Sequence, residues 1–222
     1  MNNHTMPFIQ TKRNTTNLSI LQRRIASGKS TMLLGERGTG KSRMLKELMD
    51  KYHDDKSIVY NISGLGSVSQ LLGRMAGDPD IRVHRKQEYI DQLIARPRKI
   101  FQDEGQDMTK DIYPYLKMLI DAGNVFVVAG HDHLEEKMTR AKSRDVMRRF
   151  QMLQVKSLFK KELEDSGLFK DIAPDALQWL DNVAESTGVF MDTIEDCRHY
   201  AKEQQLKIIP LEIVQDIFNG EL

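Results

Sequence analysis

The residues with the clearest chemical meaning form a glycine-rich stretch, Gly-Glu-Arg-Gly-Thr-Gly-Lys-Ser at 35–42, which satisfies G-x-x-x-x-G-K-[ST]. Glycines let backbone N–H groups curl around phosphate oxygens, and the dipole of a following helix favours the same negative charge. Lys41 would reach the β- and γ-phosphates, and the Ser42 hydroxyl would ligate Mg²⁺. The stretch therefore predicts a site for ATP and Mg²⁺, against the alternative of a plain glycine turn. The residues predicted to bind the nucleotide are Gly35, Glu36, Arg37, Gly38, Thr39, Gly40, Lys41, Ser42 and Arg43.

Two adjacent acids, Asp103 and Glu104, directly follow a short predicted strand at 99–102. An acid at the end of a strand beside a phosphate loop can hold Mg²⁺ through water, and the next carboxylate can polarise an attacking water. We therefore predict that Asp103 joins Ser42 at the metal and that Glu104 is catalytic. The alternative is an acid pair in a surface turn. Because Gln102 is polar where such strands are usually apolar, we expect this strand to be short or exposed at a sheet edge.

A third polar position follows the most apolar run of the chain, Val-Phe-Val-Val-Ala at 125–129. A polar side chain just past a buried strand can sit between the acid pair and the γ-phosphate, and so report whether that phosphate is present. His131 is the first choice for this role and His133 the second. A His-x-His pair could also bind a metal, but no third ligand is evident. A polar loop without a role is the remaining alternative.

Five basic residues surround a single acid, Asp145, between positions 140 and 149. Arg140, Arg144 and Arg148 recur every four residues, so a continuous helix would place them on one stripe. Like charges stacked in this way repel unless an anion compensates them. The anion could be DNA phosphate or the ATP of a neighbouring subunit, where an arginine supplied in trans accelerates hydrolysis by about 10³–10⁵. The alternative is a solvated basic helix. The remaining two basic residues are Lys142 and Arg149.

The elements that position these residues alternate between strand and helix patterns. Short apolar runs predict strands at 30–35, 57–62, 99–102 and 125–129. Apolar residues at helical spacing predict helices at 41–52, 67–75, 85–94 and 112–122. Strands that alternate with helices indicate an α/β domain with a mostly parallel sheet, and the phosphate loop lies between the first strand and its helix.

The character of the chain changes after about residue 156. The patterns at 160–163, 174–186, 191–203 and 210–218 all predict helices, with no convincing strand among them. Residues 1–156 carry 27 basic and 18 acidic side chains, a net charge of +9, whereas residues 157–222 carry 6 and 14, a net charge of −8. We therefore predict a nucleotide-binding core with a short basic N-terminal segment at 1–156 and a helical lid at 157–222. The basic module suits a polyanion, although chance segregation of surface charge is the alternative.

Composition excludes several classes of protein. Of the 222 residues, 40% are apolar and 29% are charged, which is enough to bury a core. No apolar run approaches the roughly 18 residues that a bilayer crossing needs, so we expect no membrane association. The single cysteine, Cys197, cannot form an internal disulfide or a cysteine-based zinc site, which fits a reducing cytoplasm.

With these residues in view, the chain resembles the AAA+ ATPases, and within them the transposition-regulator group that includes the phage Mu B protein and related target-capture ATPases. The resemblance rests on Ile-Phe-Gln-Asp-Glu at 100–104, Val-Phe-Val-Val-Ala-Gly-His at 125–131 and the arginine-bearing segment 143–150. It implies a P-loop NTPase fold with a helical lid. It also implies that Lys41 and Ser42 form Walker A and that Asp103 and Glu104 form Walker B. His131 falls at sensor 1 and Arg149 at the arginine finger, with Arg148 and Arg144 as close rivals.

The resemblance implies an ATPase that assembles on the DNA backbone without base readout, shares its ATP sites between identical subunits and disassembles on hydrolysis. A transposase would then be its protein partner, in the cytoplasm of a bacterial or phage-infected cell. A helicase loader or replication-initiation ATPase, with a helicase as partner, has the same constellation of residues. A third class with the same phosphate loop is a P-loop small-molecule kinase, and a fourth is a nucleotide-gated scaffold that does not hydrolyse ATP.

Overall fold

The computed structural model describes residues 11–52, 55–61, 66–140, 143–156, 167–185 and 187–221. The chain divides into two compact units, which are described separately below. One unit comprises Thr16–Glu36 and Lys41–Val155 and contains the sheet. Among the described residues, the other takes in Arg37–Gly40, the N-terminal residues up to Thr15 and the residues from Lys156 onward.

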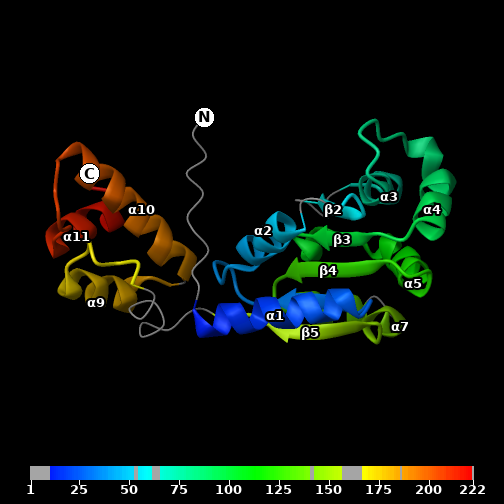
Figure 1. The fold of residues 1–222 in the computed structure, drawn as a ribbon, viewed down its shortest axis with the longest axis horizontal. Helices are drawn as coiled ribbons and strands as arrows, with labels where there is room; N and C mark the ends of the chain where they lie inside the picture. Colours follow the sequence, from blue (N-terminus) through cyan, green and yellow to red (C-terminus); the bar gives the residue numbers. More distant parts are fainter. Residues whose placement is uncertain are drawn as a thin grey trace. The chain divides into compact units, whose positions relative to one another are not determined.

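The sheet unit is built on five parallel strands in the order β2-β3-β4-β1-β5. In Figure 1 the arrowheads of β3, β4 and β5 point the same way, so all strands end at one edge of the sheet. The phosphate loop begins after β1, the strand that lies beside the central strand β4. The strands are β1 (Ser30–Leu34), β2 (Ile58–Asn61), β3 (Lys99–Gln102), β4 (Val125–Gly130) and β5 (Phe150–Gln154).

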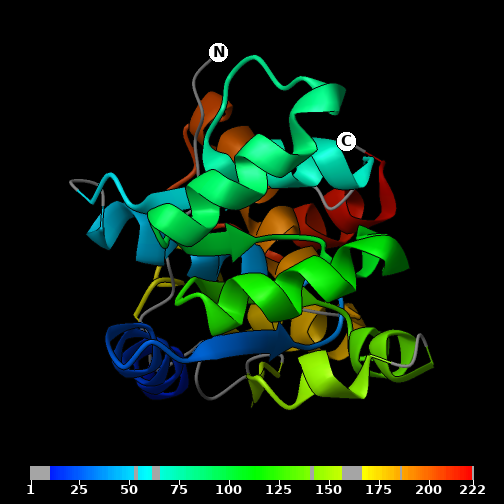
Figure 2. The ribbon, with the colours of Figure 1, turned by 90° about the vertical axis from the view of Figure 1, so that its right-hand side faces the viewer.

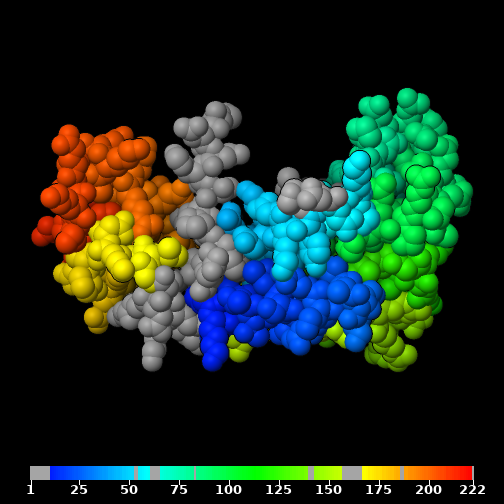
Figure 3. Space-filling model, in the orientation of Figure 1, coloured from blue at the N-terminus to red at the C-terminus, as the bar shows by residue number. Residues whose placement is uncertain are grey.

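Helices cover both faces of this sheet, and β1 and β4 are therefore buried along their whole length. Alternate strand residues such as Met32, Ile100 and Val128 form one core cluster with side chains of α3, α4 and α5. On the other face α1 and α2 lie side by side, and Lys51 Nζ donates a 2.8 Å hydrogen bond to Gln22 Oε1 between them (Figure 3). The helices are α1 (Lys12–Ala26), α2 (Lys41–Lys51), α3 (Val68–Ala76), α4 (Lys86–Ala95), α5 (Tyr113–Asp121), α6 (His133–Arg140) and α7 (Arg144–Met147).

The second unit holds three helices among its described residues: α9 (Pro174–Val183), α10 (Thr187–Glu203) and α11 (Leu211–Asn219). Their apolar faces close on a separate core cluster that includes Leu180, Ile194 and Val214. Trp179 and Phe218 pack edge to face with ring centroids 5.5 Å apart. As the sequence predicts, Pro174 lies in the first turn of its helix, where its missing N–H leaves no gap in the hydrogen bonding. The predicted helix at 160–163 lies outside the described residues.

Most of the predicted architecture is confirmed: the sheet is parallel, β3 spans the predicted 99–102, and α2 follows the phosphate loop. Of the two outcomes predicted for the strand that ends at Gln102, the first holds, because β3 is short, with four residues. Gln102 is not at an exposed edge, because β3 lies between β2 and β4 and Gln102 is fully buried. Its side-chain amide donates to the backbone oxygen of Asp103, which compensates one of its polar groups.

The prediction of a continuous arginine stripe is wrong. Arg140 ends α6, Ser143 precedes a new four-residue helix, α7, and Arg148 lies just beyond the end of α7. The chain has to turn here so that Phe150 can pair with Ser30 at the start of β5, and a single helix through 140–149 would prevent this. Lys142 lies outside the described residues.

An ion pair near the start of two strands gives a test of the fold by pH. Hydrogen bonds from the Lys99 ammonium and from Ser57 lower the pKa of Asp55 from 3.8 to about 2. A lowered folded-state pKa stabilises the fold above the unfolded pKa and loses that contribution as pH falls toward 2. In urea unfolding, Asp55→Asn should therefore be less stable than the wild type by up to about 1 kcal/mol at pH 7, because a partly exposed pair contributes little. The difference should shrink below about pH 4.

The matched control is Asp111→Asn, which changes an exposed carboxylate on the same unit. A stability difference between wild type and Asp55→Asn that stays constant from pH 7 to pH 3 would show that the pair contributes nothing.

Within the described residues, no helix is both long enough and apolar enough to cross a membrane.

Candidate nucleotide-binding site

The phosphate loop links a fully buried strand to a helix N-terminus, as the sequence predicts. β1 ends at Leu34 and α2 begins at Lys41. Between them Gly38 and Gly40 have φ angles of 76° and 88°, a left-handed conformation that side chains disfavour. A Cβ added at Gly40 would have open space around it, so the backbone conformation and not crowding calls for glycine there. The loop thus presents backbone N–H groups at the start of a helix, the arrangement that binds phosphate.

Lys41 lies among acids at the edge where the strands end. Its ammonium donates hydrogen bonds to the carbonyl oxygens of Gly35 and Glu36, at 2.8 and 2.6 Å. Burial lowers the pKa of Lys41, and the charges of three carboxylates oppose that shift. The carboxylates are Asp103, Glu104 and Asp132. The Lys41 ammonium therefore lies within electrostatic reach of the predicted metal and catalytic acids, as a site for a triphosphate and its cation requires.

Asp103 is held in place from two sides. It is only 6% exposed, one carboxylate oxygen accepts the Glu104 N–H at 2.9 Å, and the other accepts the Tyr60 hydroxyl at 3.4 Å. Burial and the neighbouring Asp103 charge together raise the pKa of Tyr60 to about 12, so the phenol stays a donor. Sequence reasoning missed Tyr60. Its position one residue before the end of the strand next to β3 is the signal that could have revealed it.

Glu104 is exposed but its backbone is constrained. Its φ of 48° is left-handed, which costs a non-glycine residue roughly 1 kcal/mol. The next residue, Gly105, opens the short 3-10 turn η2 (Gly105–Asp107) and is buried against β4. A Cβ there would lie 2.4 Å from Val128 Cγ1, so only glycine fits. The strained residue therefore lies between the end of β3 and a tightly packed turn.

His131 directly follows β4 and is half-buried. Leu34 pairs with Gly130 across the sheet, so His131 and the first residue of the phosphate loop leave neighbouring strands at the same level. The His131 backbone N–H donates to Gln106 Oε1 at 3.3 Å. Asp132, which sequence reasoning did not select, accepts a 2.6 Å hydrogen bond from Gln154 Nε2 and acts electrostatically on Lys41.

The residues present fit ATP with Mg²⁺. The buried Asp103 carboxylate and the exposed Ser42 hydroxyl supply the hard oxygen ligands that Mg²⁺ prefers. Arg43, predicted to contact the nucleotide, carries a buried Nε without a hydrogen-bond partner among the described residues. Among the residues that the structure describes, no cluster of three or more histidine, cysteine, aspartate or glutamate side chains could hold a metal by itself. The ligand set is therefore the type in which a nucleotide supplies the remaining oxygens.

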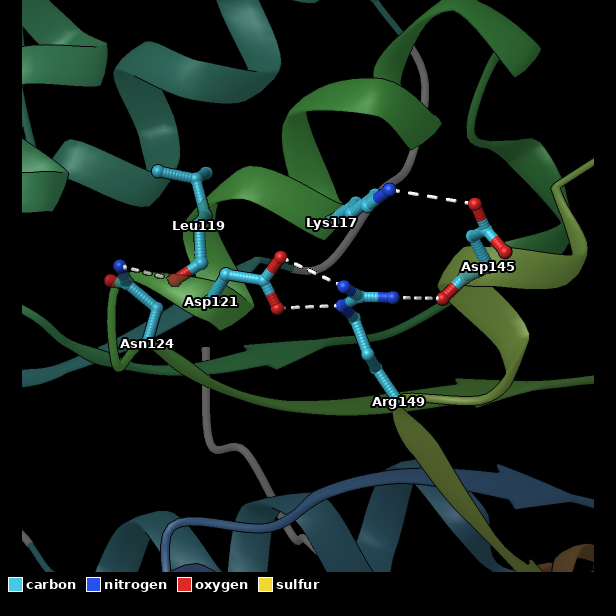
Figure 4. Close-up of polar contacts among 6 residues, drawn as sticks. All are labelled: Lys117, Leu119, Asp121, Asn124, Asp145 and Arg149. Carbon is cyan, nitrogen blue, oxygen red and sulfur yellow. Dashed lines mark hydrogen bonds and ion pairs between the residues drawn. The ribbon is translucent and has the colours of Figure 1, made fainter.

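The predicted finger arginines lie in α7 and between α7 and β5, at the opposite edge of the sheet, where the strands begin. Figure 2 views the sheet unit from this edge. Arg149 directly precedes β5 and forms a bidentate ion pair with Asp121 at the end of α5, at 2.6 and 2.8 Å (Figure 4). This hydrogen bonding lowers the pKa of Asp121 and raises that of Arg149. Arg144 and Arg148 are exposed, and neither has an ion-pair partner among the described residues.

The turn that carries Asp121 is itself fixed. The buried Asn124 side chain donates to the carbonyl oxygens of Leu93 and Leu119, and accepts the Arg98 N–H. Arg149 also donates to the Asp145 carbonyl oxygen, and Lys117 Nζ lies 3.4 Å from the Asp145 carboxylate (Figure 4). The structure therefore brings Lys41, Asp103, Glu104 and His131 to one edge of the sheet and keeps the three arginines at the other.

The comparisons with known proteins agree with this fold. The family described as AAA domain matches residues 23–138, more than half of the chain. Cdc6p from Pyrobaculum aerophilum has a similar structure, with a TM-score of 0.72 and 15% identity over 100% of this chain and 70% of that one. The Aeropyrum pernix ORC1 protein in complex with DNA is similar with a TM-score of 0.72 and 13% identity, over 99% of this chain and 68% of that one. The Aeropyrum pernix ORC2 protein, in ADPNP and ADP complexes, is similar with a TM-score of 0.69 and 15% identity, over 100% of this chain and 70% of that one.

No curated protein is significantly similar to this chain in sequence. At 13–15% identity the solved structures establish a shared fold and nothing finer. The family match covers β1 to α6, which includes the phosphate loop, the acid pair and the residue after β4. This protein therefore belongs to the AAA domain family of P-loop NTPases.

Proposed function

We propose that this protein is an ATPase that assembles with copies of itself around shared ATP molecules and, once assembled, binds the DNA backbone. The separation of the site into two edges is the observation that carries the proposal. Lys41, Asp103 and Glu104 gather where the strands end, and Arg144, Arg148 and Arg149 gather where they begin.

The arginines are too far from their own phosphate loop to serve it. A five-residue strand spans about 16 Å, so Arg149 at the start of β5 is roughly that far from the level at which β1 ends. An extended arginine side chain covers less than half of that distance, and Arg149 is turned toward Asp121. If these arginines act on a phosphate, it must be held by another subunit. Two opposite edges that complement each other generate a ring or a helical filament.

Hydrolysis in such an assembly divides among residues of two subunits. Ser42 and Asp103 would hold the Mg²⁺ that accompanies ATP, and the metal would neutralise charge on the phosphates. Lys41 binds the phosphates, Glu104 orients and deprotonates the attacking water, and His131 contacts the γ-phosphate. The neighbour's arginine stabilises charge on the transferred group. Because the ATP bridges two subunits, its hydrolysis loosens the assembly.

DNA is the polyanion that best fits the charge distribution. Residues 1–156 have a net charge of +9, and basic side chains that contact phosphates bind DNA without reading its sequence. The likeness to the Aeropyrum pernix ORC1 protein, whose structure is in complex with DNA, supports the same ligand for this chain.

The role within the cell divides the proposal into two candidates. The likeness to Cdc6 and ORC proteins favours a replication-initiation or helicase-loading ATPase, with a helicase as protein partner. A transposition regulator with a transposase as partner is the second candidate, on the sequence segments 100–104, 125–131 and 143–150. Co-purification of tagged protein with a replicative helicase or with a transposase separates them.

DNA binding measured by fluorescence anisotropy tests the proposed function. With a slowly hydrolysed ATP analogue and Mg²⁺, we expect the protein to bind duplexes of unrelated sequence equally well. Even two phosphate contacts per subunit predict a loss of about tenfold in affinity between 50 and 200 mM salt. Lys41→Ala, which removes the phosphate ligand, should bind DNA weakly with or without the analogue. Equal DNA affinity of wild type and Lys41→Ala would contradict the proposal.

A further inference from the structure

The turn η2 carries a side chain that no sequence motif selects, Gln106. Its amide nitrogen donates a hydrogen bond to the Glu104 carboxylate, and its amide oxygen accepts the His131 N–H at 3.3 Å. One side chain thus touches both the predicted catalytic acid and the residue predicted to contact the γ-phosphate. These two residues follow different strands, β3 and β4.

The backbone around Gln106 has little freedom to move. A Cβ on Gly105 would lie 2.4 Å from Val128 Cγ1, and a Cβ on Gly130 would lie 2.7 Å from Leu134 Cδ2 and 3.2 Å from Gln106 Oε1. Both glycines therefore permit a close approach between η2 and the end of β4. Leu134, fully buried at the start of α6, fills the space beside them. Packing sets the place from which the Gln106 side chain extends.

A second contact fastens the same turn to α6. Lys137 Nζ donates to the carbonyl oxygen of Gln106 and, at 3.1 Å, to that of Met108. The carboxylate of Glu104 is by contrast exposed, and a glutamate has three rotatable side-chain bonds. Among the described residues, the Gln106 amide is the side-chain group that hydrogen-bonds this carboxylate. Glu104 thus combines a constrained backbone with a side chain whose direction depends on Gln106.

We infer that Gln106 is a positioning residue for ATP hydrolysis, which directs the Glu104 carboxylate toward the γ-phosphate and links it to the backbone of His131. The inference rests on the proposed function, because it gives Gln106 a part in the same hydrolysis. Glu104 acts electrostatically on Lys41, so the carboxylate that Gln106 holds lies within electrostatic reach of the predicted phosphate-binding lysine. Because Gln106 contacts both residues, a shift of the segment after β4 would act through the Gln106 side chain on the Glu104 carboxylate.

Two substitutions separate the two hydrogen bonds. Gln106→Met keeps the length of the side chain and removes both bonds. Gln106→Glu keeps an acceptor for the His131 N–H but replaces the donor to Glu104 by a repelling carboxylate. The control is Gln87→Met, the same change at an exposed residue of α4 whose amide contacts Asp91. ATP turnover, ATP affinity from a fluorescent analogue, and amide hydrogen exchange at His131 are measured for each.

We expect kcat to fall 10- to 100-fold in both Gln106 variants, because a base displaced by about 1 Å loses that much rate. The Kd for ATP should stay within twofold of the wild type, and Gln87→Met should match the wild type throughout. The His131 amide should exchange faster in Gln106→Met and at the wild-type rate in Gln106→Glu. A Gln106→Met protein with wild-type kcat, or with kcat and affinity lost in parallel, overturns the inference.

The failure of the proposed function has a different signature. A wild-type protein that binds ATP but does not hydrolyse it contradicts the ATPase mechanism, and with it the role of Gln106 in hydrolysis. The link that Gln106 makes between Glu104 and His131 is then tested by hydrogen exchange alone. Equal exchange rates at the His131 amide in wild type and Gln106→Met would show that Gln106 does not hold the His131 backbone.

Discussion

Glu104→Gln should leave ATP binding intact and reduce hydrolysis by about 10²–10⁴, the usual contribution of a general base. The substitution keeps the shape of the side chain and removes the negative charge that deprotonates the attacking water. Because Glu104 is exposed, stability should change by less than about 0.5 kcal/mol. The lifetime of assemblies on DNA should increase as the hydrolysis rate falls, since ATP that is not cleaved keeps bridging the subunits.

Phosphate release measures the hydrolysis rate of Glu104→Gln, and the lifetime of its DNA complexes after dilution measures how long the assemblies persist. Lys41→Ala is the contrasting variant, because it should lose nucleotide binding and never form the long-lived complex. Glu104→Gln protein that hydrolyses ATP at the wild-type rate would remove Glu104 from the mechanism. Reduced hydrolysis with unchanged complex lifetime would separate hydrolysis from disassembly.

Replacement of the finger arginine should have a comparable effect on rate and a distinctive rescue. We expect alanine at Arg149, or at its rivals Arg148 and Arg144, to lower hydrolysis by about 10³–10⁵ for the residue that reaches the neighbouring phosphate. An equimolar mixture of that variant with Lys41→Ala should regain activity, although each protein alone is inactive. In a random mixture roughly one interface in four combines an intact Lys41 with an intact arginine.

The ion pair of Arg149 requires its own control. Arg149→Ala also frees Asp121, so a loss of activity could reflect a disturbed α5–β4 turn. Asp121→Asn removes the same ion pair and keeps the guanidinium. Activity lost in both variants alike would assign Arg149 a structural role and direct attention to Arg148 and Arg144, which are exposed. A mixture that regains nothing for any of the three arginines would contradict shared sites.

Much of the nucleotide edge could be predicted from sequence because its signals are local. The glycine spacing at 35–42 and the acid pair after 99–102 follow from chain-neighbour chemistry, and the strand pattern places both at one edge of a parallel sheet. β5 was not predicted, since Phe-Gln-Met-Leu-Gln mixes polar and apolar residues and lacks a continuous apolar run. α1 was missed because its N-terminal region is rich in polar residues.

The contacts that organise the site could not be predicted, because they join segments distant in sequence. Tyr60 meets Asp103 across 43 residues, and His131 meets Gln106 across 25. Each contact depends on the strand register and on glycines that permit close approach, neither of which a local pattern encodes. The arginine stripe failed for a related reason: four-residue spacing assumes one helix, and the start of β5 requires the chain to turn at Ser143.

The mass of the particle formed with ATP tests the account most directly. Light scattering after size separation, with electron microscopy of the same sample, should be carried out with a slowly hydrolysed ATP analogue, Mg²⁺ and duplex DNA. Shared ATP sites predict that the 25.6 kDa chain enters rings or filaments on the DNA, and that Lys41→Ala does not. A protein that binds the analogue and still elutes as a single copy in the presence of DNA would contradict it.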